Sequence, residues 1–187
     1  MNTETWLRGQ GVVLRPADVH DFEQLYAWSV SPSVHEWTER ALPVPFSVYR
    51  ESVQRSLTTG LRYLFVIETT DEPRRIGVTT LSLEGSSASL FMAIYPQSDR
   101  GRGYGKDAVR TIVDAAFRCL PIERIQAQSF TENERAARVL TSQGFVREGQ
   151  LRRTTFYDGD YRDMIVFGLT RPDWAAGYGT TRDPDGR

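Results

Sequence analysis

The segment 100–105 carries the clearest chemical signal in the chain, because it reads Arg-Gly-Arg-Gly-Tyr-Gly between an apolar run and an amphipathic one. A glycine loop that opens a helix directs backbone N–H groups and the positive end of the helix dipole at an anion. Glycines let the backbone approach a phosphate closely, and Arg100 and Arg102 can add charge-assisted hydrogen bonds. A plain flexible connection has little need for three glycines at a helix start. We therefore expect a phosphate-bearing ligand here.

Two common phosphate-binding motifs fail on specific residues. A Walker loop needs Gly at position 100 and Ser or Thr at position 107, but this chain has Arg100 and Asp107. A dinucleotide fingerprint needs G-x-G-x-x-G and a later acidic ribose ligand. Here the spacing is G-x-G-x-G, and the next strand carries Gln126 and Gln128.

The elements that must position this loop follow from hydrophobic periodicity. An apolar strand at 90–95 stops at Pro96, and the helix after the loop has apolar residues at helical spacing from Val109 to Leu120. A strand at 122–130 and a helix at 134–143 follow, and Gly144 is a natural C-cap. The remaining predictions are strands at 12–15, 63–67, 76–83, 145–156 and 161–169, and helices at 18–30 and 47–57.

This order of elements predicts an α+β or α/β domain with a mixed sheet. The 187 residues suit one domain, which we place at 1–174. Residues 175–187 are rich in Gly, Thr, Asp, Pro and Arg, and we expect a disordered tail there.

Composition excludes several classes of protein. The 23 basic and 24 acidic residues nearly cancel, which argues against broad nucleic-acid binding. The chain has no apolar run long enough to span a membrane. Its first residues lack the basic and apolar regions of a secretory signal, so we expect no signal peptide there. Cys119 is the sole cysteine and there are two histidines, so we expect no intrachain disulfide, no metal site and a cytoplasmic location.

A wider set of residues carries a family resemblance. Arg100, Gly103 and Gly105 match the pattern R-x-x-G-x-G, which alone is weak evidence. The ordered set that extends it is Leu14-Arg15-Pro16, Asp21, Asn133, Arg138-Val139-Leu140, Gly144-Phe145, Glu148-Gly149, Arg152, Asp158-Gly159, Asp163 and Asp173-Trp174. Over about residues 10–174 the chain resembles the GNAT superfamily of acyl-CoA-dependent N-acyltransferases, in its RimJ/RimL-type branch. The resemblance implies a central, mostly antiparallel mixed sheet flanked by helices.

The resemblance also implies acetyl-CoA as co-substrate and assigns its contacts. The pantetheine arm would pair like an extra strand with the backbone of Met92, Ala93 and Ile94. The pyrophosphate would bind at Arg100, Gly101, Arg102, Gly103, Tyr104, Gly105 and Lys106. Asn133 would contact the pantetheine arm while also capping the helix at Glu134, and Arg138 completes the set.

Catalytic and acceptor groups are marked more weakly. His35, Glu36 and Trp37 occupy the segment where this branch places its acceptor site, and Tyr157 is a further candidate. Glu84 could act as a general base through water, and Ser129 is an alternative. A Glu in this position is more often a solvated turn residue. The two positions that commonly supply the family's acid hold Ala136 and Leu140, and neither side chain can donate a proton.

Three hypotheses remain open. In the first, a neutral primary amine, from a protein N-terminus or a small molecule, attacks the thioester while a backbone amide near Met92 or Ala93 stabilises the oxyanion. The second keeps the fold but uses a longer acyl-CoA or an aminoacyl-tRNA as donor. The third is a non-catalytic acyl-CoA-binding module, which Ala136 and Leu140 support. The sequence names no acceptor and leaves a homodimer open.

Overall fold

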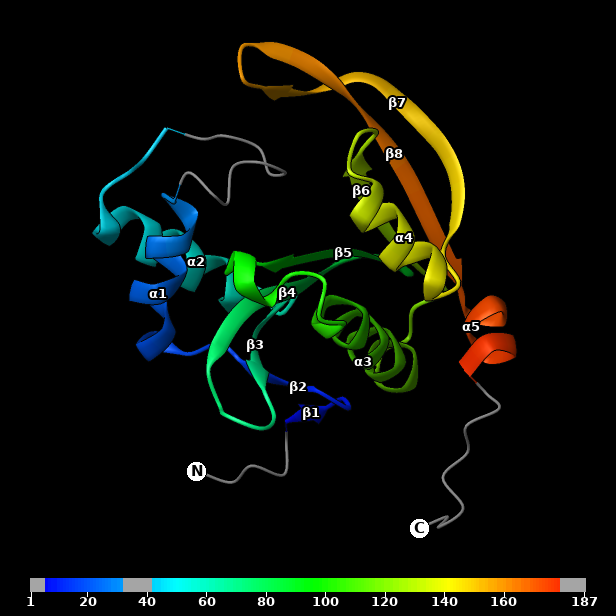
Figure 1. The fold of residues 1–187 in the computed structure, drawn as a ribbon, viewed down its shortest axis with the longest axis horizontal. Helices are drawn as coiled ribbons and strands as arrows, with labels where there is room; N and C mark the ends of the chain where they lie inside the picture. The colour runs from blue at the N-terminus through cyan, green and yellow to red at the C-terminus, as the bar shows by residue number, and fades with distance from the viewer. Residues whose placement is uncertain (1–5, 32–41, 179–187) are drawn as a thin grey trace.

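One sheet of eight strands, in the order β1-β2-β3-β4-β5-β6-β8-β7, forms the centre of the computed structural model of the chain (Figure 1). The structure describes residues 6–31 and 42–178. Every neighbouring pair of strands is antiparallel except β5 and β6, which run parallel. The predicted mixed, mostly antiparallel sheet is therefore confirmed.

The order of elements agrees with the prediction and adds a short first strand and a last helix. The strands are β1 (Leu7–Arg8), β2 (Val12–Pro16), β3 (Arg62–Thr69), β4 (Arg75–Glu84), β5 (Ser87–Ile94), β6 (Arg124–Phe130), β7 (Val146–Tyr157) and β8 (Asp160–Thr170). The helices are α1 (Phe22–Ser29), α2 (Phe46–Thr58), α3 (Tyr104–Cys119), α4 (Glu134–Ser142) and α5 (Arg171–Tyr178), with 3-10 turns η2 (Val19–Asp21) and η3 (Gln97–Asp99). No helix of the described ranges is long and apolar enough to cross a membrane.

Two apolar clusters hold helices against the sheet. In the larger cluster, the apolar face of α3, including Val109, Ile112 and Phe117, packs on strands β2 to β6 and β8. In the smaller one, Phe22 and Leu25 of α1 pack on Val78 together with residues of α2. The 3.6-residue period read from the sequence is thus the period of the buried face of α3.

Asp107 fixes the start of α3. Its carboxylate accepts hydrogen bonds from the backbone N–H groups of Gln10, Gly11 and Val12 at 3.1, 2.7 and 3.1 Å. The turn between β1 and β2 is therefore tied to the first turn of the helix that follows the glycine loop. This gives Asp107 a structural role at the position where a Walker loop would have its hydroxyl.

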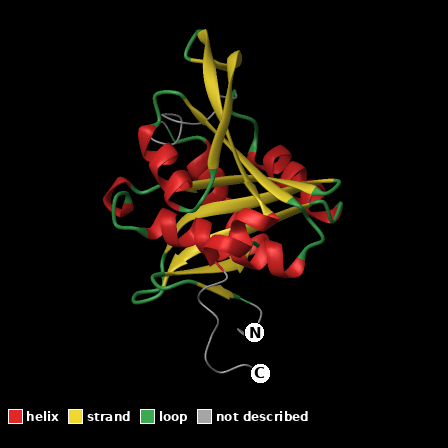
Figure 2. Cartoon of the chain, turned by 90° about the vertical axis from the view of Figure 1, so that its right-hand side faces the viewer, coloured by secondary structure: helices red, strands yellow, loops and turns green. Residues whose placement is uncertain are grey.

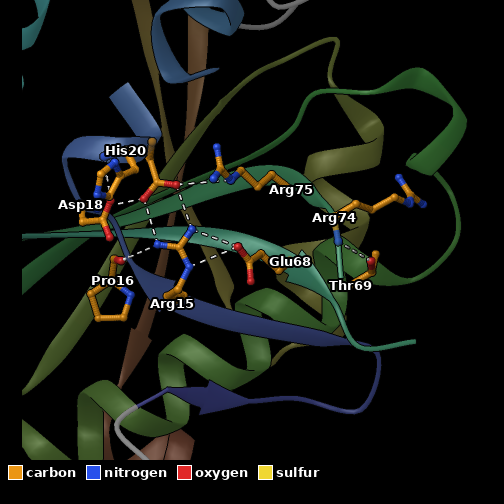
Figure 3. A network of polar contacts seen from close by, with 9 residues as sticks. Arg15, Pro16, Asp18, His20, Glu68, Thr69, Arg74 and Arg75 are labelled. Atoms are coloured by element: carbon orange, nitrogen blue, oxygen red, sulfur yellow. Dashed lines mark hydrogen bonds and ion pairs between the residues drawn. The ribbon is translucent and has the colours of Figure 1, made fainter. Parts of the chain in front are cut away.

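A buried ion network joins β2, η2 and β3 (Figure 3). The Arg15 guanidinium donates to both carboxylate oxygens of Asp21, at 2.9 and 2.8 Å, and to Glu68 at 2.9 and 3.1 Å. Burial by itself would raise the pKa of Asp21, but the hydrogen bonds from Arg15 and from the Asp18 backbone hold it below its usual value. The network lies among structural elements and lines no part of the cleft described below.

Strands β7 and β8 form a long hairpin that projects from the body of the molecule (Figure 2). Asp158 and Gly159, between the strands predicted at 145–156 and 161–169, have φ values of 50° and 87°, as the central residues of a two-residue hairpin turn do. A bulge interrupts the pairing at Arg153, whose φ is 50° and whose N–H donates to Asp163 at 2.8 Å. The outer end of the hairpin is therefore bent relative to its base.

The predicted tail begins too early, because helix α5 continues to Tyr178. The Arg171 guanidinium donates to the backbone carbonyl oxygens of Phe117, Leu120 and Ile122 at 2.7 to 2.9 Å. The Trp174 ring stacks on Phe117 at a centroid distance of 5.4 Å. These contacts hold the first part of α5 on the body of the protein, and the helix carries residues 175–178, which composition alone assigned to a tail. Residues 179–187 lie outside the described part of the chain.

Candidate functional site

The sheet opens between its two parallel strands. Pairing of β5 with β6 runs from Ser87 and Arg124 to Leu90 and Ala127 and then stops. Beyond that point β5 continues beside β4, and β6 continues beside β8. The inner edges at 91–94 and 128–130 therefore face each other without a strand between them in the described structure. Such edges present backbone donors and acceptors to an extended ligand.

A cleft of about 910 Å³ occupies this opening. Its walls come from β5, β6, α3, α4 and the loop that includes Gly101 and Gly103. The carboxyl ends of β5 and β6 lead into the loop before α3 and into α4, so the N-termini of both helices flank the cleft. Both helix dipoles favour negative charge at its mouth.

The glycine loop has room for an anion. Gly101 and Gly103 have φ values of 81° and 90°, and a Cβ on either would meet no atom within 4 Å. The left-handed backbone explains the need for glycine, and the open space is where a phosphate could approach the N–H groups. Gly105 differs, because a Cβ there would lie 3.1 Å from the Met92 methyl carbon. The loop therefore fits the phosphates of a ligand such as CoA.

Side chains before the loop fix its position. Arg74 donates to both oxygens of Asp99, and its Nη1 lies 2.6 Å from one of them. These hydrogen bonds, opposed by burial, lower the pKa of Asp99, which has no exposed side-chain surface. Arg100 Nε donates to the Ile94 carbonyl oxygen at 3.1 Å, and its Nη2 donates to Tyr95 at 3.2 Å. Arg100 thus anchors the loop to the end of β5, a role that its position in the motif did not indicate.

A second, polar hollow of about 420 Å³ adjoins the cleft. It shares Arg100, Asn133, Arg135 and Arg138 with the larger one. Asn133 caps α4, because its Oδ1 accepts from the Ala136 N–H at 3.1 Å. The predicted cap is confirmed. The three arginines share the hollow with Glu132 and Glu134, and Arg138 donates to Glu134 at 3.0 Å.

Most predicted cofactor residues meet in this cleft. Those that line it are Met92, Ala93, Ile94, Arg100, Gly101, Gly103, Gly105, Lys106, Asn133 and Arg138. Arg102 and Tyr104 do not line it. Arg102 lies over the Tyr104 ring, 5.7 Å from its centroid. Tyr104 packs against the larger apolar cluster.

Of the catalytic and acceptor candidates, one lines the cleft, two lie elsewhere, and three are outside the described residues. Ser129 lines the cleft. Glu84 is exposed at the end of β4 beside the β4–β5 turn, away from the lining residues. The Tyr157 ring packs on Phe130 at 5.3 Å and is not part of the lining. His35, Glu36 and Trp37 lie outside the described residues.

Several lining residues were missed by the sequence analysis. Thr155 and Met164 come from the β7–β8 hairpin, and Tyr95 follows β5. Burial, with a smaller contribution from Tyr49, raises the pKa of Tyr95, so its hydroxyl stays protonated at neutral pH. Ala136 and Leu140 also line the cleft, as their place in the motif implied. The described residues contain no group of three or more His, Cys, Asp or Glu side chains placed to hold a metal ion.

Comparisons with known proteins place this geometry in a wider context. The family described as "Acetyltransferase (GNAT) domain" matches residues 12–146. The probable N-acetyltransferase YjcK of Bacillus subtilis is 26% identical over 181 residues, which are 89% of this chain and 98% of that protein. The ribosomal protein uS5-alanine N-acetyltransferase of Escherichia coli is 30% identical over 121 residues, 63% of this chain and 62% of its own length. A crystal structure of spermidine N-acetyltransferase from Vibrio cholerae, in complex with CoA and spermine, superposes with a TM-score of 0.81 at 20% identity, covering 88% of this chain and 98% of that one.

Proposed function

Because this chain belongs to the GNAT acetyltransferase family and is an N-acetyltransferase, we propose that it transfers an acetyl group from acetyl-CoA to a primary amine. The observation that carries the proposal is the opening of the sheet between β5 and β6, with the glycine loop at its mouth. An extended arm fits between two strand edges, and an anion fits at the loop.

Different parts of the cleft would bind different parts of acetyl-CoA. The N–H groups of 101–106 and the dipole of α3 would hold the pyrophosphate. The backbone of Met92, Ala93 and Ile94 would pair with the pantetheine arm, and Asn133 and Arg138 would contact the cofactor from α4. Arg100 would act indirectly by holding the loop on the Ile94 and Tyr95 carbonyl groups.

Acetyl-CoA supplies the acetyl group as a thioester, which a neutral amine can attack directly. A backbone N–H near Met92 or Ala93 would donate to the carbonyl oxygen as negative charge develops on it. Amine nitrogen bonds to the carbonyl carbon, the carbon–sulfur bond breaks, and the proton lost by nitrogen passes to solvent. The two α4 positions that commonly supply the family's acid hold Ala136 and Leu140, whose side chains have no proton to donate, so we infer no dedicated acid at either position.

Two classes of amine are supported by the relatives. One relative is named for the alanine of a ribosomal protein, and one structural neighbour was solved with spermine. We therefore infer an acceptor that is either a protein N-terminus or a small polyamine.

The test has two stages. Calorimetry with CoA should show one site per chain. Mass spectrometry on a panel that includes spermidine and an alanine-ended peptide should then show acetylation that requires both enzyme and acetyl-CoA. Tight CoA binding without modification of any amine would contradict catalysis and favour a binding module. Faster transfer from a longer acyl-CoA would instead indicate that this compound is the donor. Salt-sensitive binding of aminoacyl-tRNA would point to aminoacyl-tRNA as the donor.

A further inference from the structure

We propose that the Ser129 hydroxyl contacts the sulfur of bound acetyl-CoA and stabilises that sulfur as it departs. The inference rests on the proposed function and assigns one side chain to the leaving-group end of the reaction. It starts from a feature of the protein alone: among the described residues, Ser129 Oγ is the buried side-chain polar atom without a hydrogen-bond partner.

Such an atom is unusual in a folded protein. Ser129 is 6% exposed, and most buried hydroxyl groups find a partner because desolvation without one is costly. Ser89, another serine of the cleft, shows the ordinary situation, since its hydroxyl accepts from Gln126 Nε2 at 3.0 Å. An unpartnered hydroxyl in a cleft wall is a place where a ligand atom can supply the missing partner.

Strand geometry gives the position of this hydroxyl. Every second residue of β6 is buried, namely Ile125, Ala127 and Ser129. Gln126 and Gln128 alternate with them. Ser129 therefore shares a face with Ala127, where the pairing with β5 ends. Extending the register that pairs Leu90 with Ala127 places Ser129 across the opening from Met92.

This position corresponds to the reactive end of the proposed ligand. An arm that starts at the glycine loop and runs along β5 from Ile94 passes Met92 as it approaches the closed end of the opening. The proposed oxyanion donor is the backbone near Met92 or Ala93. The sulfur next to that carbonyl would then lie on the side of β6, where Ser129 is the residue with an unpartnered hydroxyl.

The chemistry requires a hydrogen bond and no net proton transfer from serine. As the nitrogen–carbon bond forms and the carbon–sulfur bond breaks, sulfur leaves with the electron pair. Ser129 Oγ–H donates a hydrogen bond to this developing thiolate, whose ordinary pKa is about 8.5. The amine's proton goes to solvent, so serine keeps its own proton throughout. This arrangement serves the leaving group in a cleft where Ala136 and Leu140 have replaced the family's acids.

The kinetic test is Ser129→Ala, with Thr80→Val as control. Thr80 is buried in β4 and does not line the cleft, so its change removes a buried hydroxyl elsewhere. We expect Ser129→Ala to lower kcat about 10- to 100-fold while the Kd for CoA changes little, because the hydrogen bond strengthens only as charge develops. Thr80→Val should leave kcat unchanged. An unchanged kcat in folded Ser129→Ala that binds CoA would overturn the proposal.

A proximity test is independent of turnover. In a Cys119→Ser background, Ser129→Cys should form a mixed disulfide with CoA under mild oxidation, detected as the mass gain of one CoA and suppressed by excess acetyl-CoA. Ser142→Cys in the same background presents an exposed thiol on α4 away from the cleft, and it should not show this suppression. Absence of the disulfide in a Ser129→Cys chain that binds CoA would also overturn the assignment. Failure of the unmodified chain to bind CoA would instead contradict the proposed function.

Discussion

Two residues in or beside the glycine motif have structural roles next to the positions proposed to bind the acetyl donor. Asp107 and Arg100 lie in or beside the glycine motif, yet their side chains tie the motif to β2 and to the end of β5. The sequence located the loop through its glycines, because left-handed backbone has a strong residue preference. It did not reveal the partners of the two side chains. The N–H groups that bind Asp107 are distant in sequence, and the carbonyl groups that bind Arg100 come within reach only when the loop folds back on β5.

Gly103→Asp tests the anion site. The variant places a carboxylate beside the N–H groups that would hold the pyrophosphate, and we expect CoA affinity to fall about 100-fold. Gly159→Asp is a matched control, because Gly159 has a φ of 87° against 90° for Gly103 and both have open space around a Cβ. The control carries the same backbone strain in the β7–β8 turn. Equal CoA affinities of the two folded variants by calorimetry would argue against the loop assignment.

Asp21→Asn tests the buried network of Figure 3. Removing this charge leaves Glu68 as the carboxylate partner of Arg15 in this network, and we expect a loss of about 2 kcal/mol in the free energy of unfolding at neutral pH. Because the folded-state pKa of Asp21 is lowered, its contribution is complete above the unfolded-state pKa of about 3.9. The contribution disappears as the pH falls through the folded-state value. The difference between wild type and variant should therefore shrink in acid.

The control for that experiment is Glu51→Gln. Glu51 pairs with Arg55 on α2, but both side chains are more than two-thirds exposed. Exposed pairs of this kind contribute about 0.5 kcal/mol or less. A pH-independent gap for Asp21→Asn, or a loss no larger than that of Glu51→Gln in denaturant titrations, would show that the network is not stabilising in the way described.

Helices and strands were predicted well where the spacing of apolar residues along one segment determines the buried face. They were predicted poorly where contacts with other segments determine the arrangement. The buried face of α3 follows directly from its apolar spacing. Nothing in the residues of β5 or β6 signals that the strands separate after Leu90 and Ala127, because each reads as an ordinary strand. The separation depends on what each strand pairs with on its other side and on the helices that flank the opening. The site's shape is therefore a property of several elements together.

Gly77→Ala tests the wall of the cleft formed by β5. A Cβ at Gly77 would overlap the Ala93 carbonyl oxygen, so the two strands could not keep their present separation. We expect a loss of about 2 kcal/mol in stability and a clear loss of CoA affinity, because β5 supplies the proposed pairing edge. Gly149→Ala is the control, since a Cβ on this strand glycine meets nothing within 4 Å. Normal CoA binding by Gly77→Ala would show that the close approach of Gly77 to Ala93 is not needed for the CoA site.

At the level of the whole molecule, the last helix joins parts that are distant in sequence. Arg171 and Trp174 contact the end of α3 and the segment before β6. The glycine, aspartate and proline content of the chain after Trp174 predicted a tail, because composition reports local preference and not such distant contacts. The order of strands and helices could be predicted, but the position at which the folded unit ends could not.

Truncation tests that boundary. Removal of 179–187 should leave the thermal midpoint unchanged, whereas removal of 171–187 should lower it strongly because it exposes Phe117 and frees three backbone carbonyl groups. Trp174→Ala in the full chain should cost about 1–3 kcal/mol through lost packing on Phe117. Calorimetric scans would measure all three. Equal midpoints for the two truncations would contradict a structural role for α5.

The parallel pairing of β5 with β6 also affects the order in which strands can pair while the chain is being synthesised. β3, β4 and β5 follow one another through short turns, so their pairing closes small loops and can form early. Joining β5 to β6 closes a loop that contains all of α3, and its entropy cost is larger. Until residues 124–127 leave the ribosome, β5 presents an open edge along its whole length. The edge proposed to receive an acetyl donor is thus also the place where the nascent chain is most exposed to pairing with the wrong strand.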